Sequence, residues 1–212
     1  MTVWRRRSRS WRNASFAVLD FETTGLDLDR DHVLSLGLVP VVDGRVRLAG
    51  SLYRVVRPPI PVPASSIRVH GIRPDELEDA PTLDTVAGDL LAALDDRLLV
   101  AHAAVIELAF LERIVRTRRA RRMRRAIDVV FLAEELAERE RAGAVPSPRL
   151  ADLAELFGVP VLRTHHAFAD ALVTAQLFLV LATRLERLGA GGVRDLARAG
   201  RSPTTRRFFL GR

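Results

Sequence analysis

The distribution of apolar and polar positions along the first sixty residues predicts strands. The run "FAVLDF" at residues 16–21 is almost wholly apolar, which is typical of a buried strand. Residues 31–58 read as two further strands joined at Asp43-Gly44, a strong hairpin signal. Pro40 lies inside the first of these strands and predicts an edge or a bulge there, because proline donates no ladder hydrogen bond.

The pattern changes to helical spacing in the rest of the chain. The Pro-rich stretch at residues 58–67 reads as irregular, and "RLLVA" at 97–101 reads as a short buried strand. Apolar residues recurring at helical spacing predict helices over residues 83–95, 103–117, 129–141, 148–157 and 167–188. Three strands followed by strands alternating with helices predict an α/β fold, with a mixed sheet covered by helices.

Length and composition predict one domain with short flanking segments. We divide the 212 residues into a basic N-terminal arm (1–13), a domain (14–188) and a C-terminal tail (189–212). The sequence has no cysteine and no run of about 18 uncharged apolar residues, so we expect neither disulfides nor a membrane span. The basic arm lacks the apolar segment of a signal peptide. These features predict a cytoplasmic protein.

The charge of the chain is informative only where it clusters. The net charge is +7, but all 33 basic residues are arginine, which indicates a coding bias as readily as a polyanionic partner. The densest cluster, "RTRRARRMRR" at residues 116–125, has seven arginines in ten positions. A phosphate-binding patch and a solvated helix end are both consistent with it.

Two acids stand at the end of the first strand, where core residues are expected. Asp20 and Glu22 are two positions apart, so their side chains point to the same face. Two adjacent carboxylates repel each other, and a divalent cation with oxygen ligands, Mg²⁺ or Mn²⁺, removes that repulsion. The alternatives are acids in solvent at the strand end, or acids paired with arginines. The Thr23-Thr24-Gly25 turn that follows favours a ligand-holding site.

Two later stretches carry further candidates. His102 follows the short strand and Glu107 lies among apolar neighbours in the next helix, where a solvated surface glutamate is the alternative. In "THHAFADA", His165 precedes Asp170 by five residues, and Asp170 falls in the first turn of the last long helix. An acid there is also a common helix-capping residue.

Together these stretches resemble the DEDDh family of 3′-to-5′ exonucleases, from about Phe16 to Leu181. The family motif D-x-E-T-T-G stands here as "DFETTG", and H-x-A-x-x-D-A stands as "HHAFADA", starting at His165. The segments "VHGIRPDELEDAP", "AIDVVFLAEEL" and "LADLAELFGVP" look like the family segments that lie between these two motifs. The resemblance implies a ribonuclease H-like fold, a mixed five-stranded sheet flanked by helices.

The resemblance also implies a mechanism and a set of site residues. The family removes nucleoside 5′-monophosphates from single-stranded or frayed 3′ ends with two Mg²⁺ or Mn²⁺ ions, and we expect DNA to be favoured over RNA. It implies that Asp20 bridges the ions, that Glu22 and Asp170 complete the first ion site, that Glu107 serves the second, and that His165 is the general base. The residues implied in substrate binding are Thr23, Thr24, Gly25, His70 and His102.

The sequence departs from the family pattern in the second motif. H-N-A-x-F-D is expected where "HAAVIE" stands, so Glu107 replaces aspartate, Ala103 replaces asparagine and Ile106 replaces phenylalanine. Glutamate keeps the charge but lengthens the side chain by roughly 1.5 Å, one C–C bond. A catalytically degenerate nucleic-acid-binding module and a polymerase-associated scaffold therefore remain alternatives, and a DNA polymerase remains a candidate partner.

Overall fold

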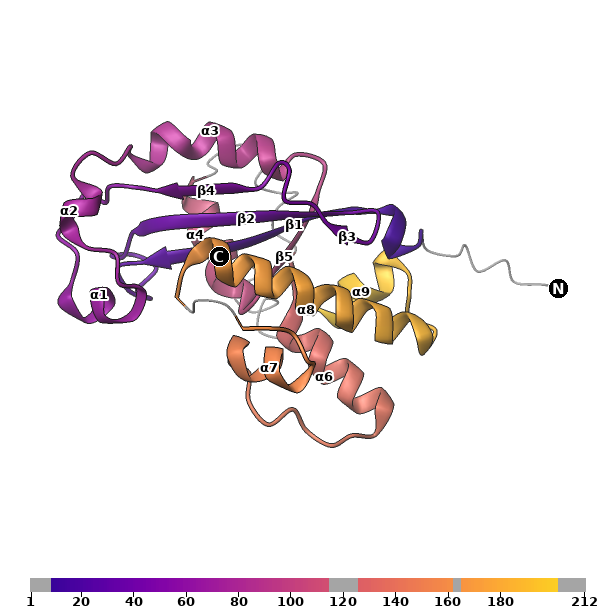
Figure 1. Ribbon diagram of the computed structural model, residues 1–212. Coiled ribbons are helices and arrows are strands. Elements are labelled where there is room, and N and C mark those ends of the chain that lie inside the picture. Colours follow the sequence, from indigo (N-terminus) through magenta and orange to yellow (C-terminus); the bar gives the residue numbers. More distant parts are fainter. Residues whose placement is uncertain (1–8, 115–125, 162–164, 202–212) are drawn as a thin grey trace.

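A computed structural model of the chain describes residues 9–114, 126–161 and 165–201, and shows a mixed sheet flanked by helices (Figure 1). The strand order is β3-β2-β1-β5-β6, and β4 also pairs with β2. The strands are β1 (Ser15–Thr23), β2 (Val33–Val42), β3 (Arg45–Val46), β4 (Leu52–Val55), β5 (Leu98–Ala101) and β6 (Ala126–Asp128). The pairs on the β2 side of β1 are antiparallel, whereas β1, β5 and β6 are parallel. The predicted fold class is confirmed, with six strands in the described residues instead of five because the two-residue β3 adds to the count.

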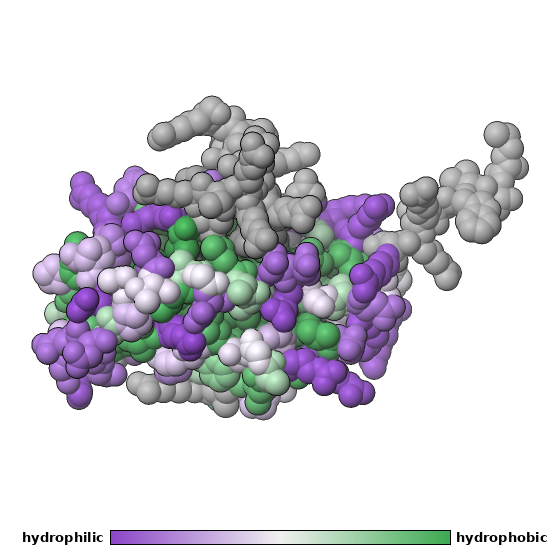
Figure 2. Space-filling view, turned by 90° about the horizontal axis from the view of Figure 1, so that it is seen from above, coloured by the Kyte–Doolittle hydropathy of each residue, from purple (hydrophilic) through white to green (hydrophobic). Residues whose placement is uncertain are grey.

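Helices cover both faces of this sheet. The described helices are α1 (Ala64–His70), α2 (Pro74–Leu77), α3 (Leu83–Leu94), α4 (Ala104–Ile114), α6 (Val129–Glu140), α7 (Leu150–Leu156), α8 (Ala167–Arg187) and α9 (Val193–Ala199). Figure 1 shows α8 lying along the sheet, with α6 and α7 beside it and α3 next to β4. On the surface seen from the side of α3, hydrophobic residues lie along the middle and hydrophilic residues gather toward the ends (Figure 2).

The strand alternation decides which side chains face α8. In β1, Phe16 and Val18 belong to the core cluster that contains the buried residues of α8. Ala17 and Leu19 belong to the cluster on the other face, with residues of α3 and α4. Because strand side chains alternate, Asp20 shares the face of Phe16 and Val18. The first strand therefore sends its acids toward the α8 side of the sheet.

The predicted hairpin is found, and Pro40, where an edge or a bulge was expected, lies at a local edge of the sheet without a bulge at that position in the β1–β2 pairing. Asp43 and Gly44 have φ angles of 53° and 65°, and the neighbouring Val42 pairs with Arg45. Pro40 pairs with Ala17 of β1 on one side of β2. On its other side β2 pairs with β3 at its end and with β4 nearer its start, and Pro40 falls in the gap between these pairings. A residue without an N–H fits there, because no strand needs that donor.

Some elements differ from the sequence-based expectations. The stretch expected to be irregular ends in α1, which begins at Ala64 directly after Pro63, a residue whose fixed φ suits a helix start. The short β6 and α9 were not predicted. The core also takes residues from both flanking segments, since Trp11 and Leu196 are fully buried in it. The boundaries of the arm and the tail stay a prediction.

Within the described residues, α8 is the one helix long and apolar enough to cross a membrane by length and composition. Its apolar residues are explained by packing, since Leu177, Phe178 and Leu181 are fully buried against the sheet and its neighbouring helices. This helix is therefore a core helix of the domain.

Candidate active site

Four acids from three different elements converge at one edge of the sheet. Asp20 and Glu22 lie near the carboxyl end of β1, Glu107 lies in the first turn of α4, and Asp170 lies in the first turn of α8. The parallel pairing of β1 with β5 brings these ends together, because α4 begins directly after β5. The side chain of Glu22 is only 8% exposed and that of Glu107 only 5%. The alternatives of a solvated Glu107 and of a Glu22 in solvent are therefore wrong.

The cluster is electrostatically unfavourable without a cation. Burial, and then the carboxylates of Glu107, Asp170 and Glu22, raise the pKa of Asp20 well above its usual range. Burial and the nearby Asp170 raise the pKa of Glu22 to about 7. Burial also raises the pKa of Glu107 and of Asp170, although the N–H of His165 partly offsets the rise at Asp170. Each shift has burial as its largest cause and favours the neutral acid.

The donor set fits a divalent cation. Ligand atoms of Glu22, His165 and Asp170 lie within 4.8 Å of one another. Oε2 of Glu107 is buried and has no hydrogen-bond partner. Among the ion pairs of residues 9–114, 126–161 and 165–201, none involves the four acids, so no arginine in these ranges neutralises them. Mg²⁺ and Mn²⁺ prefer oxygen ligands, and these carboxylate oxygens have few hydrogen bonds or ion pairs with the described residues.

The two adjacent histidines have different surroundings. His165 is exposed beside the acids, has a φ of 56°, and donates its backbone N–H to Oδ2 of Asp170 at 2.9 Å. The ring of His166 instead stacks on Tyr53 and accepts the N–H of Ala169 through Nδ1. The histidine that the sequence motif selects is thus the exposed one, whose ring nitrogen lies within 4.8 Å of ligand atoms of Glu22 and Asp170.

A cleft of about 570 Å³ opens onto these groups. Its lining residues outside the acid cluster include His102, Arg149, Leu150, Ala151, Asp152 and Val161. The ring of His102 is held by the carbonyl of Pro148, 2.7 Å from Nε2. His102 therefore lies in the wall of this cleft, which is consistent with its predicted contact with the substrate.

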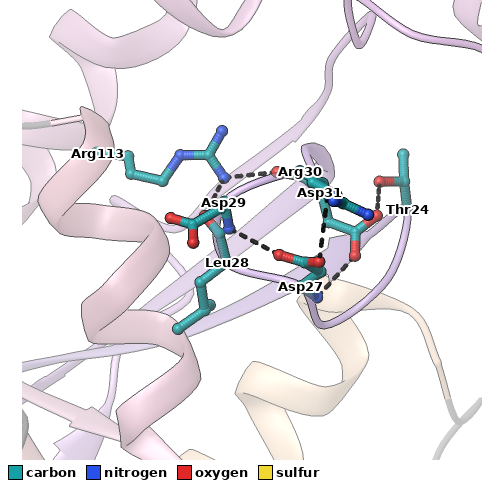
Figure 3. A network of polar contacts seen from close by, with 7 residues as sticks. All are labelled: Thr24, Asp27, Leu28, Asp29, Arg30, Asp31 and Arg113. Atoms are coloured by element: carbon teal, nitrogen blue, oxygen red, sulfur yellow. Dashed lines mark hydrogen bonds and ion pairs between the residues drawn. The ribbon is translucent and has the colours of Figure 1, made fainter.

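The turn after β1 is held by its own hydroxyl groups (Figure 3). Thr23 donates its hydroxyl to the carbonyl of Gly25 at 2.7 Å. Thr24 donates its hydroxyl to Oδ1 of Asp31 at 2.6 Å and accepts the N–H of His32. The threonine hydroxyls expected to bind substrate are thus donors within the protein. Among the described hydrogen bonds, none uses the N–H of Gly25, which leaves that group for a ligand.

His70 also lies close enough to His165 to interact with it electrostatically. It ends α1, its ring is 4% exposed, and its Nδ1 accepts the N–H of Ile72 at 2.9 Å. Its Nε2 is buried without a partner, and burial followed by the charge of His165 lowers its pKa. A neutral imidazole with an unused Nε2–H near His165 is consistent with the predicted substrate contact.

Two residues of the site region were missed by the sequence reasoning. Arg149 stands at the cleft and pairs with Asp152, and no sequence signal marks it. Asp128 is 4% exposed and accepts the N–H of Ala104 and of Val130, each at 2.9 Å. It thereby holds the start of the helix that carries Glu107, and its place before an apolar helical run is the signal of a cap. The arginine cluster at 116–125 lies outside the described residues.

Comparison with known families identifies the class of protein. The family model described as "Exonuclease" (RNase_T) matches residues 17–178. The chain therefore belongs to this exonuclease family, whose members are nucleases that hydrolyse nucleic acids.

Curated relatives place the same domain inside longer proteins. The chain is 31% identical over 181 residues to a "DNA polymerase III PolC-type" of Thermotoga petrophila, covering 85% of this chain and 13% of that protein. It is 33% identical over 204 residues to a "Putative bifunctional exonuclease/endonuclease protein" of Mycobacterium tuberculosis, covering 89% and 29%. A "3'-5' exonuclease DinG" of Staphylococcus saprophyticus is 26% identical, covering 85% and 19%. The chain thus spans less than a third of the length of each of these relatives.

Solved structures share the fold at lower identity. Escherichia coli exonuclease I in complex with a dT13 oligonucleotide superposes with a TM-score of 0.70 at 16% identity, covering 83% of this chain and 42% of that one. Exonuclease X in complex with 5′ overhanging duplex DNA has a TM-score of 0.66 at 20% identity, covering 88% and 99%. These likenesses confirm the ribonuclease H-like architecture.

Proposed function

We propose that this chain is a 3′-to-5′ exonuclease that needs Mg²⁺ or Mn²⁺ and releases nucleoside 5′-monophosphates. The observation that carries the proposal is the convergence of four acids that have no ion-pair partner in the described part of the chain. Two of these acids are deeply buried, and the group lies beside an exposed histidine and an open cleft. A cluster of that kind weakens the fold unless a cation occupies it. The family membership gives the class of reaction, and the motifs favour the 3′-to-5′ direction.

The proposed ion sites use the acids in distinct ways. Asp20 interacts electrostatically with the other three carboxylates and would contribute to both ion sites. Glu22 and Asp170 would complete the first site, and Glu107 would serve the second. When bound, the two ions supply Lewis-acid activation of the attacking water and charge stabilisation at the leaving 3′ oxygen. The longer Glu107 side chain reaches its site from a helix start that Asp128 holds in place.

The residues of the chain move the proton and position the substrate. His165 accepts the proton of the attacking water, because an imidazole can act as a base near neutral pH. Oδ2 of Asp170 holds the backbone of His165, which fixes where that ring lies. The phosphorus–oxygen bond to the 3′ oxygen breaks, the phosphate stays on the released nucleoside, and the leaving oxygen takes up a proton. The N–H of Gly25 and the ring of His70 border the terminal nucleotide.

The proposed substrate is the single-stranded or frayed 3′ end of DNA, with RNA as a weaker substrate. An open cleft admits an end whose bases are unpaired. A DNA polymerase III among the relatives and an exonuclease I bound to a dT13 oligonucleotide among the similar structures support DNA as the substrate. We further propose a DNA polymerase as a partner.

A second candidate function is a nucleic-acid-binding module without catalysis, and Glu107 is the observation that favours it. A carboxylate one bond longer than the family's aspartate could hold the second ion out of place. This alternative retains the cleft and the first ion site but releases no nucleotides.

Digestion of end-labelled oligonucleotides tests the proposal. Single-stranded DNA and RNA of the same sequence are labelled at the 5′ end and incubated with Mg²⁺, Mn²⁺ or EDTA. We expect ladders that shorten from the 3′ end, mononucleotide products, faster loss of DNA, and no reaction in EDTA. Asp20→Ala serves as the inactive control, and Asp29→Ala, in the exposed loop, serves as the matched active control. Binding without release by the wild type in both metals would establish the second candidate instead.

A further inference from the structure

Three residues form a row across the sheet beneath the start of α8. Asp20 of β1 stands directly opposite Gly37 of β2, and Gly37 stands directly opposite Tyr53 of β4. Directly opposed residues of antiparallel strands point to the same face, so the whole row faces α8. A catalytic acid is thus followed by a residue with no side chain and then by an aromatic ring.

The glycine in this row leaves a slot for the backbone of α8. A Cβ atom added at Gly37 would overlap the carbonyl group of Ala167 and the amide nitrogen of Phe168. Those atoms are backbone, so no side-chain rotation can relieve the overlap. Glycine in a strand marks such close approaches of another chain segment. Any larger residue at position 37 must lift the first turn of α8 from the sheet.

The tyrosine in the row contacts the residue that precedes the same turn. The rings of Tyr53 and His166 are stacked with their centroids 4.6 Å apart at an angle of 21°. His166 accepts the N–H of Ala169 through Nδ1 and the N–H of Asp170 through its carbonyl. The ring that rests on Tyr53 therefore belongs to the residue that caps the helix.

The supported turn carries two of the proposed catalytic groups. Asp170 follows the Ala167–Phe168 backbone by less than one turn, and its Oδ2 accepts the N–H of His165. We propose that Gly37 and Tyr53 are positioning residues of the exonuclease site. They form a seat that sets how closely Asp170 and His165 approach Asp20 and Glu22. The inference rests on the proposed function, because it assigns these residues to the same site.

The seat can be separated from general stability because the rest of α8 is anchored elsewhere. Further along the helix, Leu177, Phe178 and Leu181 are fully buried in the core. A change in the seat therefore shifts the first turn while most of the helix stays packed. Turnover and cation binding should respond more strongly than folding does, which a purely structural role would not produce.

Four variants test the seat in parallel with the wild type. Gly37→Ala fills the slot, Tyr53→Leu removes the ring, and Tyr53→Phe keeps it. Leu36→Val is the matched control, since Leu36 is the buried neighbour of Gly37 on the opposite face of the same strand. The measurements are kcat and KM on single-stranded DNA, Mn²⁺ affinity by titration calorimetry, and the Tm in EDTA.

We expect Gly37→Ala to lower both kcat and Mn²⁺ affinity by roughly 10–100-fold, as misplacement of supporting groups does at other metal sites, with KM little changed. Tyr53→Leu should show a smaller loss in the same two quantities. Tyr53→Phe should behave like the wild type, and Leu36→Val should lower only the Tm.

Wild-type kcat and Mn²⁺ affinity in folded Gly37→Ala and Tyr53→Leu would overturn the seat. If Gly37→Ala does not fold, Tyr53→Leu alone decides. A loss in Tyr53→Phe as large as in Tyr53→Leu would also overturn it, since the hydroxyl and not the stack would then matter. A wild type that releases no nucleotide with either metal would refute the proposed function. The Mn²⁺ affinities of the variants relative to the wild type would still test whether Gly37 and Tyr53 position the site.

Discussion

Two groups of acids stand within a few residues of each other, and they are satisfied in opposite ways. Asp27, Asp29 and Asp31 lie in the loop between β1 and β2 (Figure 3). Asp20 and Glu22 lie in β1, just before that loop. Two of these loop acids, Asp27 and Asp31, accept hydrogen bonds from groups of the protein. The strand acids are repelled by other acids, and ion pairs do not offset this among the described residues.

The loop acids hold the loop together. Asp31 accepts the hydroxyl of Thr24 at 2.6 Å and the N–H of Asp27 at 2.7 Å. Asp27 in turn accepts the N–H of Asp29, and Arg113 of α4 donates to carbonyl oxygens of the loop. The loop network therefore ties the turn after β1 to the helix that carries Glu107.

Burial alone does not separate the two kinds of acid. Asp128 is 4% exposed and Glu107 is 5% exposed, so both are deeply buried. Asp128 accepts two backbone N–H groups, whereas Oε2 of Glu107 accepts none. For these two acids, hydrogen bonding and not depth of burial separates Asp128, which holds the fold together, from Glu107, which is proposed to hold an ion.

The largest expected effect contrasts one acid from each group. Asp20→Ala should reduce nucleotide release by more than about 10³-fold, since metal stabilisation is worth several kcal/mol. It should also raise the Tm of the metal-free protein, because it removes a repelled carboxylate. Asp31→Ala should lower that Tm, since it leaves donors unpaired at a cost of about 1–3 kcal/mol. Calorimetry in EDTA measures the Tm of both variants. Tm shifts of the same sign would contradict the contrast between the two groups of acids.

Glu107 should follow Asp20 and not Asp128. Glu107→Gln should reduce nucleotide release by more than about 10²-fold, because the neutral amide loses the charge that several kcal/mol of ion stabilisation need. Glu107→Asp should stay active, and Mn²⁺ should support the wild type better than Mg²⁺. Release assays with each metal check this. Activity gained only in Glu107→Asp would contradict it.

The adjacent His165 and His166 extend the comparison, because one ring lies beside the acids and the other supports the fold. His165→Ala should lower kcat by about 10²-fold, as removal of a positioned base does, while Mn²⁺ affinity changes little. His166→Ala should lose less, because its ring supports the turn and does not face the acids. Steady-state kinetics on the same oligonucleotide decide. A greater loss at His166 would reverse the assignment of the general base.

The last expected effect is on stability without metal. Burial and Asp170 raise the pKa of Glu22 to about 7, from an ordinary value of 4.5. The folded protein therefore keeps a proton that the unfolded chain releases, so stability falls as the pH rises from about 4.5 to about 7. The loss should reach about 3 kcal/mol and then level off. Denaturant titrations in EDTA measure it; Glu22→Gln should flatten the curve, and an unchanged slope would exclude Glu22 as its source.

The sequence predicted those parts of the fold that local patterns encode. The apolar run of β1, the Asp43-Gly44 hairpin and the helical spacing of α3 and α8 each follow from neighbours in the chain. The three-residue β6 is too short to show an alternation. The packing of α9 and Trp11 depends on partners far away in the sequence, so local patterns could not reveal it.

The candidate site was predictable as a set of residues but not as a geometry. The spacing of Asp20 and Glu22 and the "HHAFADA" motif led to residues that the structure brings together. The burial of Glu107 depends on how α4 packs against the sheet, which the sequence does not specify. The hydrogen bond from the Thr24 hydroxyl to Asp31 could not be predicted either, because it depends on where the loop places Asp31. Gly37 carried a signal, glycine inside a strand, whose partner only the structure identifies.

Asp128 has a consequence for the order in which the domain assembles. Its side chain accepts the N–H groups of Ala104 and Val130, and its own N–H is bound by the carbonyl of Gly200. Residues separated by up to 96 positions in the chain thus meet at one carboxylate and one peptide group. Such contacts close only when distant segments have come together. The amide hydrogens of Ala104 and Asp128 should therefore exchange with solvent only through unfolding of the whole domain. Amide hydrogens of nearby loops should exchange faster, through local opening.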